Sequence, residues 1–251
     1  MRFAFGTLTV LPVHVTRWDR AAARGGMLCA PVAGLVVGLC AAGAGAALHA
    51  AGAGAALAAV AAVAVPAVLT RGLHLDGLAD TADGLGSGRP AEAALRIMKQ
   101  SDVGPFGVVT LVLVVLAQVA AVAAAFEEGW GRGAVRVVVV ALAARGALTL
   151  ASRAGVPAAR PEGLGAAVAG AVPRAAAFTA AAVVLVVCAG LGAWWGPWEA
   201  VRCAAAPLLG WCAAQLLLRR CRRRLGGVTG DVFGALAETA GVTAAVVLTL
   251  G

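Results

Sequence analysis

Three aspartates, Asp76, Asp80 and Asp83, lie within eight residues in the stretch GLHLDGLADTADGL at positions 72–85. On a helix, Asp80 would lie about 40° to one side of Asp76, and Asp83 about 20° to the other side. The three carboxylates would then share one face, where like charges repel and need compensation. Hard oxygen ligands at this spacing suit Mg²⁺ or Mn²⁺, which usually share their coordination with water and substrate phosphate. The cluster therefore predicts a metal site that acts on a phosphorylated substrate.

The spacing of the aspartates leaves two other interpretations open. The cluster could be a solvated acidic face, or it could belong to a cation or proton pathway in a transporter. Gly77 and Gly84 each follow an aspartate, and we expect them to leave room for a ligand to approach the backbone. His74 lies away from the aspartate face, which favours packing or a phosphate contact over metal binding.

Two further segments carry polar residues that could reach a phosphate. Residues 89–100, RPAEAALRIMKQ, are typical of a short amphipathic helix at a membrane surface. Arg96 and Lys99 flank its apolar face, where they could bind phosphate or lie as cations at the interface. The stretch GGVTGD at 226–231 has the composition of an anion-binding nest at a helix start, which Thr229 or Asp231 could cap. Asp231 and Glu238 are seven residues apart and would share one face of the helix that follows.

The elements that position these residues are membrane helices. The chain has 251 residues, of which 61% are hydrophobic and only 13% charged. Residues 25–70, 104–126 and 175–198 contain no Asp, Glu, Lys or Arg, and about 20 apolar residues suffice for a spanning helix. We predict one all-α integral membrane domain over 1–251, a polytopic helical bundle with six or seven transmembrane helices. The seven candidate spans are 27–48, 54–71, 104–126, 134–151, 175–194, 200–218 and 232–250.

Charge predicts how the bundle is oriented. Segments 1–26, 71–103, 152–174 and 219–231 hold 16 of the 20 basic residues, among them the run RRCRRR that begins at Arg219. The positive-inside rule places these segments in the cytoplasm, so the Asp-rich segment 72–103 and the basic, Gly-rich segment 219–231 open to the same side. The net charge of +8 is thus a topology signal, and we expect no nucleic-acid partner. The six single cysteines are expected to be small apolar fillers, and the apolar stretch from Phe3 to Val13 an interfacial or re-entrant piece.

Four motifs together resemble one known family. They are GLHLDGLADTADGL at 72–85, RIMKQSDVGPFG at 96–107, EGLG at 162–165 and RRLGGVTGDVFGALAE at 223–238. In order and spacing they are similar to the cobalamin synthases, membrane enzymes also called adenosylcobinamide-GDP ribazoletransferases. Val10, Gln100 and Gly241 depart from that pattern, because the family often has arginine, aspartate and a second acid at these positions.

The resemblance implies a late step of vitamin B12 assembly in the cell membrane, with an active site that faces the cytoplasm. The implied substrates are adenosylcobinamide-GDP and α-ribazole or its 5′-phosphate, GMP is the leaving group and Mg²⁺ the cofactor. Asp76 and Asp80 would then bind Mg²⁺, and Asp83, or Asp80 itself, would be a further ligand or the general base. Asp231 would complete the metal site, Glu238 is a matched acid, and the phosphate candidates are Arg96, Lys99 and Arg145.

Two alternatives remain open at this point. The first is a membrane transferase similar to CDP-alcohol phosphatidyltransferases, although Asp80 stands where that pattern has arginine. The second is a non-enzymatic secondary transporter, although the aspartate motif has no second copy. The sequence makes no prediction of oligomeric state.

Overall fold

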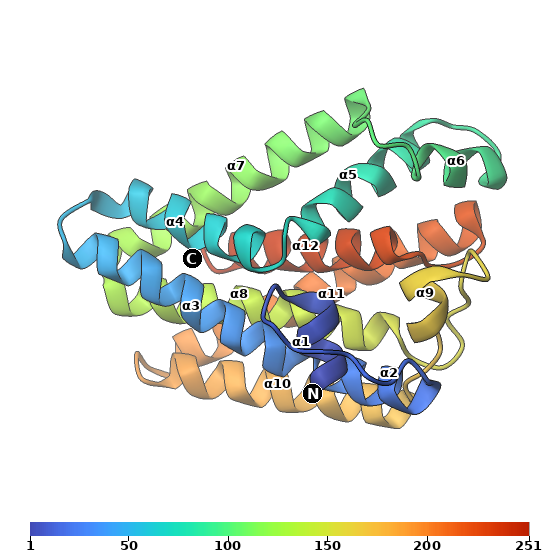
Figure 1. The fold of residues 1–251 in the computed structure, drawn as a ribbon. Coiled ribbons are helices and arrows are strands. Elements are labelled where there is room, and N and C mark those ends of the chain that lie inside the picture. Colours follow the sequence, from blue (N-terminus) through green and yellow to red (C-terminus); the bar gives the residue numbers. More distant parts are fainter. Residues whose placement is uncertain (251) are drawn as a thin grey trace.

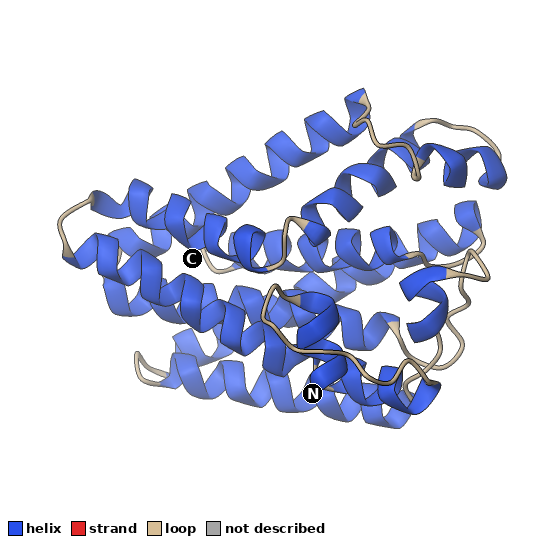
Figure 2. Cartoon of the chain, in the orientation of Figure 1, coloured by secondary structure: helices blue, strands red, loops and turns tan. Residues whose placement is uncertain are grey.

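The structure, a computed structural model, describes residues 1–250, and within them every regular element is a helix (Figures 1 and 2). Six helices are long and apolar enough to cross a membrane, which confirms six of the seven predicted spans. They are α3 (Ala30–Ala50), α7 (Pro105–Glu127), α8 (Trp130–Ala151), α10 (Arg174–Ala193), α11 (Pro197–Leu225) and α12 (Gly230–Val247). Four helices are short: α1 (Arg2–Leu8), α2 (Arg20–Leu28), α6 (Ala91–Ile97) and α9 (Gly163–Val168).

The helix boundaries follow local sequence signals. Pro105 and Pro197 stand in the first turns of α7 and α11, where proline costs no hydrogen bond and its fixed φ suits the helix. Gly226 ends α11 in a left-handed conformation with φ 84°, which glycine adopts without a steric penalty. Because α11 runs for 29 residues, the arginine run that begins at Arg219 lies inside this helix, beyond the end of the predicted span 200–218.

The span predicted over 54–71 is not among the six helices that are long enough to cross a membrane. Helix α4 (Gly54–Leu69) ends early, and α5 (Leu73–Gly86) continues after a bend of 87°. Arg71 and Gly72 form the break, both with positive φ, of 53° and 67°. Helix α4 is 16 residues long, about 24 Å, which is shorter than a hydrocarbon core of about 30 Å. Only α4 and α5 together have the length and composition of a seventh, broken span. The Asp-rich helix is thus the second half of a bent pair, which is either a broken span or a re-entrant loop.

The bundle is centred on α8 and α12. Helix α12 contacts α5, α8 and α11, and α3 packs along α8. Gly34 and Gly38 let α3 approach closely, since a Cβ on either would lie 2.7 Å from the side chain of Arg145 or Ala141. Such small residues are typical of helix contacts in membranes. Helices α7 and α10 are mostly exposed and lie at the periphery, so the core that positions the site is α5, α8 and α12.

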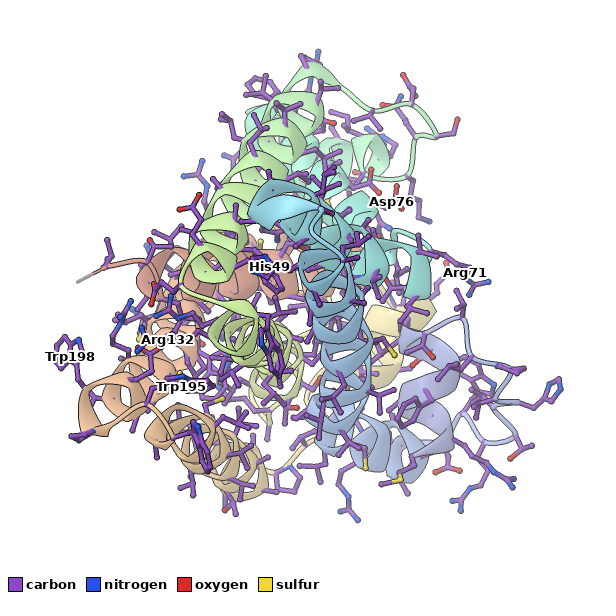
Figure 3. The ribbon with its side chains drawn as sticks, turned by 90° about the vertical axis from the view of Figure 1, so that its left-hand side faces the viewer. His49, Arg71, Asp76, Arg132, Trp195 and Trp198 are labelled. Carbon is purple, nitrogen blue, oxygen red and sulfur yellow. The ribbon has the colours of Figure 1, made fainter. Side chains whose placement is uncertain are left out.

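The two ends of the bundle differ. Helices α6 and α9 lie at one end, at the right of Figure 1, and the α3–α4, α7–α8 and α10–α11 turns lie at the other. Trp130, Trp194 and Trp198 border those turns and are largely exposed. Figure 3 looks onto this end, where Trp195 and Trp198 lie with Arg132 on the side away from Asp76. Exposed tryptophans at one level of a bundle are typical of a membrane interface.

Candidate active site

The site is built where α5 crosses the start of α12. A Cβ on Gly77 would lie 2.6 Å from the carbonyl oxygen of Asp231, and a Cβ on Gly234 would lie 3.0 Å from the main chain of His74. The two helices therefore touch backbone to backbone, which only glycine permits. The expectation that Gly77 and Gly84 leave room for a ligand is wrong, because Asp231 fills the space at Gly77 and the side chain of Met98 fills the space at Gly84.

This crossing brings the predicted acids of two distant segments together. Asp80 lies within electrostatic reach of Asp76, Asp83 and Asp231. Asp76 is exposed and Asp80 half-buried, and within residues 1–250 neither carboxylate accepts a hydrogen bond or forms an ion pair with the protein. Asp231 Oδ2 accepts a hydrogen bond from Thr229 Oγ1 at 3.1 Å. The site thus holds two free carboxylates beside a third that one hydroxyl orients.

Asp83 has different surroundings. Asp83 is only 7% exposed, and its two carboxylate oxygens accept hydrogen bonds from the backbone N–H groups of Gly104 and Gly107 at 2.8 and 2.9 Å. These donors belong to the start of α7, whose first N–H groups have no partner within the helix. Asp83 therefore ties α5 to α7. Its predicted role as metal ligand or general base stays a prediction.

Arg160 is a site residue that the sequence analysis missed. It lies in the loop after α8, its guanidinium donates to the carbonyl oxygen of Leu95, and its charge reaches both Asp80 and Asp231. Its loop is held against the segment before α12, because Ala159 N–H donates to the Val228 carbonyl and Val228 N–H to the Pro157 carbonyl, both at 2.9 Å. The signal that could have found Arg160 is its place two residues before the motif EGLG.

Two cavities flank these acids. The larger, about 890 Å³, is lined by Asp76, the break between α4 and α5, and α1 residues. The smaller, about 300 Å³, is lined by polar groups of His74, Arg160, Glu162, Thr229 and Asp231. Leu73 and Leu164 line both cavities, so the cavities lie on the two sides of one apolar partition. The buried His74 Nδ1 has no partner within residues 1–250, which leaves a polar atom available beside the smaller cavity.

Helix α12 begins with the N-cap that was predicted at Thr229 or Asp231. Thr229 Oγ1 accepts the N–H of Val232 at 3.2 Å, so the predicted N-cap is confirmed. Two glycines of the segment 226–231 have different surroundings. Gly227 packs against the main chain of Pro157, whereas Gly230 faces open space and lines the smaller cavity.

The other predicted residues lie apart from the crossing. Arg96 forms an exposed ion pair with Glu92 at 2.7 Å, and Lys99 is exposed just beyond α6. Arg145 is buried in α8, within electrostatic reach of His74 and Glu238. Glu238 accepts a hydrogen bond from Gln118 at 2.8 Å inside the bundle. The roles proposed for these residues stay predictions.

The acids of the crossing fit a divalent cation by charge and donor type. Among residues 1–250, no three His, Cys, Asp or Glu side chains are already arranged to hold a metal ion. Asp76, Asp80 and Asp231 nevertheless supply the oxygen donors that Mg²⁺ prefers. Their three negative charges and the one positive charge of Arg160 leave a net charge of −2, which a divalent ion would neutralise. The donor types and the net charge therefore suit a divalent ion, whose coordination a phosphorylated ligand would complete.

The sequence matches the proteins of one known family over nearly the whole chain. The family described as cobalamin-5-phosphate synthase matches residues 1–249. An adenosylcobinamide-GDP ribazoletransferase of Frankia casuarinae is 41% identical, and the alignment covers 98% of this chain and 92% of that protein. Proteins of the same name from a Nocardioides species and from Bradyrhizobium diazoefficiens are 38% and 39% identical, with 95% of this chain covered in each case and 93% and 88% of those proteins. No solved structure matches the chain.

Proposed function

The chain belongs to the cobalamin-5-phosphate synthase family, and from this membership we propose that it joins adenosylcobinamide-GDP to α-ribazole or α-ribazole 5′-phosphate with release of GMP. It is a transferase of cobalamin biosynthesis with multiple membrane helices. The observation that carries the proposal is the family match over residues 1–249. We set aside a CDP-alcohol phosphatidyltransferase and a transporter, because no finding favours either.

We place the reaction at the crossing of α5 and α12. The substrate would bring a diphosphate, and the crossing offers carboxylates for a metal, a guanidinium and two flanking cavities. The proposed metal ligands are Asp76, Asp80 and Asp231, and Mg²⁺ held there would offset the charge of the diphosphate. Arg160, positioned by its loop against the segment before α12, is the proposed phosphate-binding residue nearest to them.

The reaction would be a displacement at phosphorus. A hydroxyl oxygen of the ribazole forms a bond to the phosphorus that carries the corrinoid arm, the bond from that phosphorus to the bridging oxygen breaks, and GMP leaves. The hydroxyl proton would pass to a carboxylate of the cluster, and Asp80, its half-buried member, is our candidate. Catalysis of this kind depends mainly on positioning and electrostatic stabilisation, which a rigid crossing of two helices can supply.

The function is tested with the full chain in detergent or proteoliposomes. The protein is incubated with adenosylcobinamide-GDP and either α-ribazole or its 5′-phosphate, and GMP and the joined corrinoid are measured. We expect both products in equal amounts. Absence of GMP with both acceptors would contradict the proposal, and the preferred acceptor is read from the ratio of the two rates.

The metal site is tested in the same assay. Asp76→Ala and Asp80→Ala are each expected to lose about 10²–10³ in rate, the usual cost of removing one electrostatic contact from a catalytic site, and chelation with EDTA should abolish turnover until Mg²⁺ is restored. Glu127→Ala is the matched control, because it removes an exposed carboxylate from the far end of α7. Near-normal turnover of the double Asp76→Ala, Asp80→Ala variant would contradict the metal assignment.

The proposed phosphate contact of Arg160 is tested in the same assay. Arg160→Ala should raise the KM for adenosylcobinamide-GDP more than Arg160→Lys does, because lysine keeps the positive charge.

A further inference from the structure

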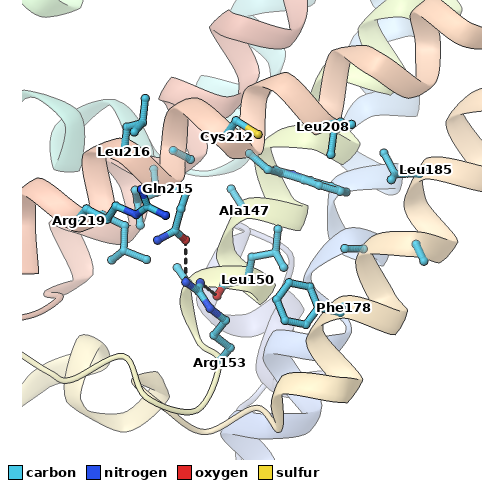
Figure 4. A pocket seen from close by; sticks show the side chains of 17 residues that line it. Ala147, Leu150, Arg153, Phe178, Leu185, Leu208, Cys212, Gln215, Leu216 and Arg219 are labelled. Carbon is cyan, nitrogen blue, oxygen red and sulfur yellow. Dashed lines mark hydrogen bonds between the residues drawn. The ribbon is translucent and has the colours of Figure 1, made fainter.

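A second large hollow lies away from the acid site, between α8, α10 and α11 (Figure 4). Its volume is about 710 Å³, within the range of about 300–1,000 Å³ that small-molecule sites occupy. None of its lining residues lines either cavity beside the aspartates. Its walls are apolar side chains such as Phe178, Leu185, Leu208 and Trp211. We call it the α10–α11 groove.

The groove opens toward the lipid side of the bundle. Phe178, Leu208 and Leu216 are 58%, 49% and 64% exposed, so its rim continues the apolar outer surface of α10 and α11. Trp211 forms part of the wall and is fixed there, because its indole Nε1–H donates to the Ala143 carbonyl at 2.8 Å. A rigid apolar wall that opens to lipid favours an apolar occupant that enters from the bilayer.

One end of the groove is cationic. Figure 4 shows Arg153, Gln215 and Arg219 together at this end, where Arg153 donates to Gln215 Oε1 at 2.7 Å and to the Leu150 carbonyl at 2.5 Å. Burial, together with the charges of Arg222, Arg174 and Arg219, lowers the pKa of Arg153. No carboxylate forms an ion pair with these four arginines in the part of the chain that the structure describes. A cluster of like charges beside an apolar groove lacks the anion that would neutralise it.

The length of the groove matches one leaflet of a membrane. Leu208 and Arg219 mark its two ends on α11, eleven residues apart, which is about 16 Å of helix. Half of a hydrocarbon core is about 15 Å. The arginines also lie at the end of the bundle to which the positive-inside rule assigns the cytoplasm, where the leaflet is anionic.

We propose that the α10–α11 groove binds an anionic phospholipid, with the phosphate of its headgroup between Arg153 and Arg219 and an acyl chain along Leu185, Leu208 and Trp211. Charge complementarity selects the anionic headgroup, and the apolar wall selects the chain. The site is independent of the transferase reaction, since it shares no residue with the acid site.

Binding is measured through the tryptophan in the wall. The purified full chain in detergent is titrated with phosphatidylglycerol that carries bromine on its acyl chains, which quenches nearby indole fluorescence. We expect a saturable component of the quenching that Trp211→Phe removes, above a non-saturable background from the exposed tryptophans Trp130, Trp194 and Trp198, which lie outside the groove. Brominated phosphatidylcholine should give much less of the saturable component at equal concentration. A saturable component of equal size with both lipids, or one that persists in Trp211→Phe, would overturn the proposal.

The headgroup contact is tested by charge. The double variant Arg153→Gln, Arg219→Gln should bind phosphatidylglycerol about 25-fold more weakly, since each basic residue near an anionic lipid contributes about a factor of five. The matched control Arg220→Gln, Arg223→Gln removes the same amount of charge, both from α11, without touching the groove and should bind as the wild type does. Equal losses in both variants would overturn the site. Full competition by inorganic phosphate would also overturn the site, because it would indicate an anion site without a lipid. A second copy of the chain that covers the groove would overturn it as well.

Discussion

At the scale of single residues, Asp83 shows how two carboxylates on one helix come to have different surroundings. Asp80 is half-buried without a hydrogen-bond donor, whereas Asp83 accepts two backbone N–H groups at the start of α7. Hydrogen bonds to an ionised carboxylate contribute about 1.5–3 kcal/mol each. The geometry of Asp83 is therefore that of a structural cap, and its part in the chemistry can be separated from that of its neighbours by experiment.

Substitution of Asp83 distinguishes a cap from a base. Asp83→Asn keeps one carbonyl acceptor for α7, whereas Asp83→Ala leaves both N–H groups without a partner, which costs about 1–3 kcal/mol for each buried donor. We expect thermal stability in detergent to fall in the order wild type, Asn, Ala, and GMP release to persist in the Asn variant. A fully stable but inactive Asp83→Asn protein would instead identify Asp83 as a catalytic carboxylate.

The sequence could predict the acids but not all of their partners. The spacing of Asp76 and Asp80 on one helix face follows from helix periodicity alone, and the approach of Asp231 followed from topology and resemblance. The bonds of Asp83 to Gly104 and Gly107 and the approach of Arg160 depend on how loops fold back, and no local pattern encodes that. Arg160 has one local signal, its place two residues before the motif EGLG, but that place does not predict its approach to the acids.

At the scale of elements, the α5–α12 crossing determines where the acids meet. Gly77 is the closest point, since a Cβ there would lie 2.6 Å from the Asp231 carbonyl oxygen. The main chain of α12 cannot give way as the end of a flexible side chain could. A single methyl group at Gly77 would therefore separate Asp231 from Asp76 and Asp80.

Gly77→Ala tests this crossing. Overpacking of this kind costs about 1–3 kcal/mol, and we expect both a lower thermal unfolding temperature and a large loss of GMP release. Gly190→Ala is the matched control, because a Cβ on Gly190 in α10 would meet no atom within 4 Å; it should gain up to about 1 kcal/mol from helix propensity and keep full activity. Equal behaviour of the two variants would refute the role of the close contact.

At the scale of the whole molecule, hydropathy predicted five crossings to within four residues at each end and a sixth that continues seven residues further along α11, but it missed the break in the seventh. Uncharged runs of about 20 residues identify spans reliably because the bilayer demands them. The break at Arg71 and Gly72 depends on left-handed backbone conformations, and Arg71 is a residue type that rarely adopts one. As a result, the Asp-rich helix lies against α12 inside the bundle and not in a free loop.

Whether α4 and α5 cross the membrane determines on which side the segment before α3 lies relative to the segment after α5, and this can be measured. If α4 and α5 form one crossing, the exposed His14 before α3 and Arg89 after α5 face the same side, because two crossings separate them, and Trp194 after α10 faces the other side. In intact cells, an impermeant maleimide should then label Trp194→Cys, and it should label His14→Cys and Arg89→Cys only after permeabilisation. The unmodified chain, with its six free cysteines, gives the background. Labelling of only one of His14→Cys and Arg89→Cys in intact cells would mean that α5 turns back before crossing. The arginines of α11 would still share the side of Arg89, to whose carbonyl oxygen Arg224 donates, because four crossings separate them.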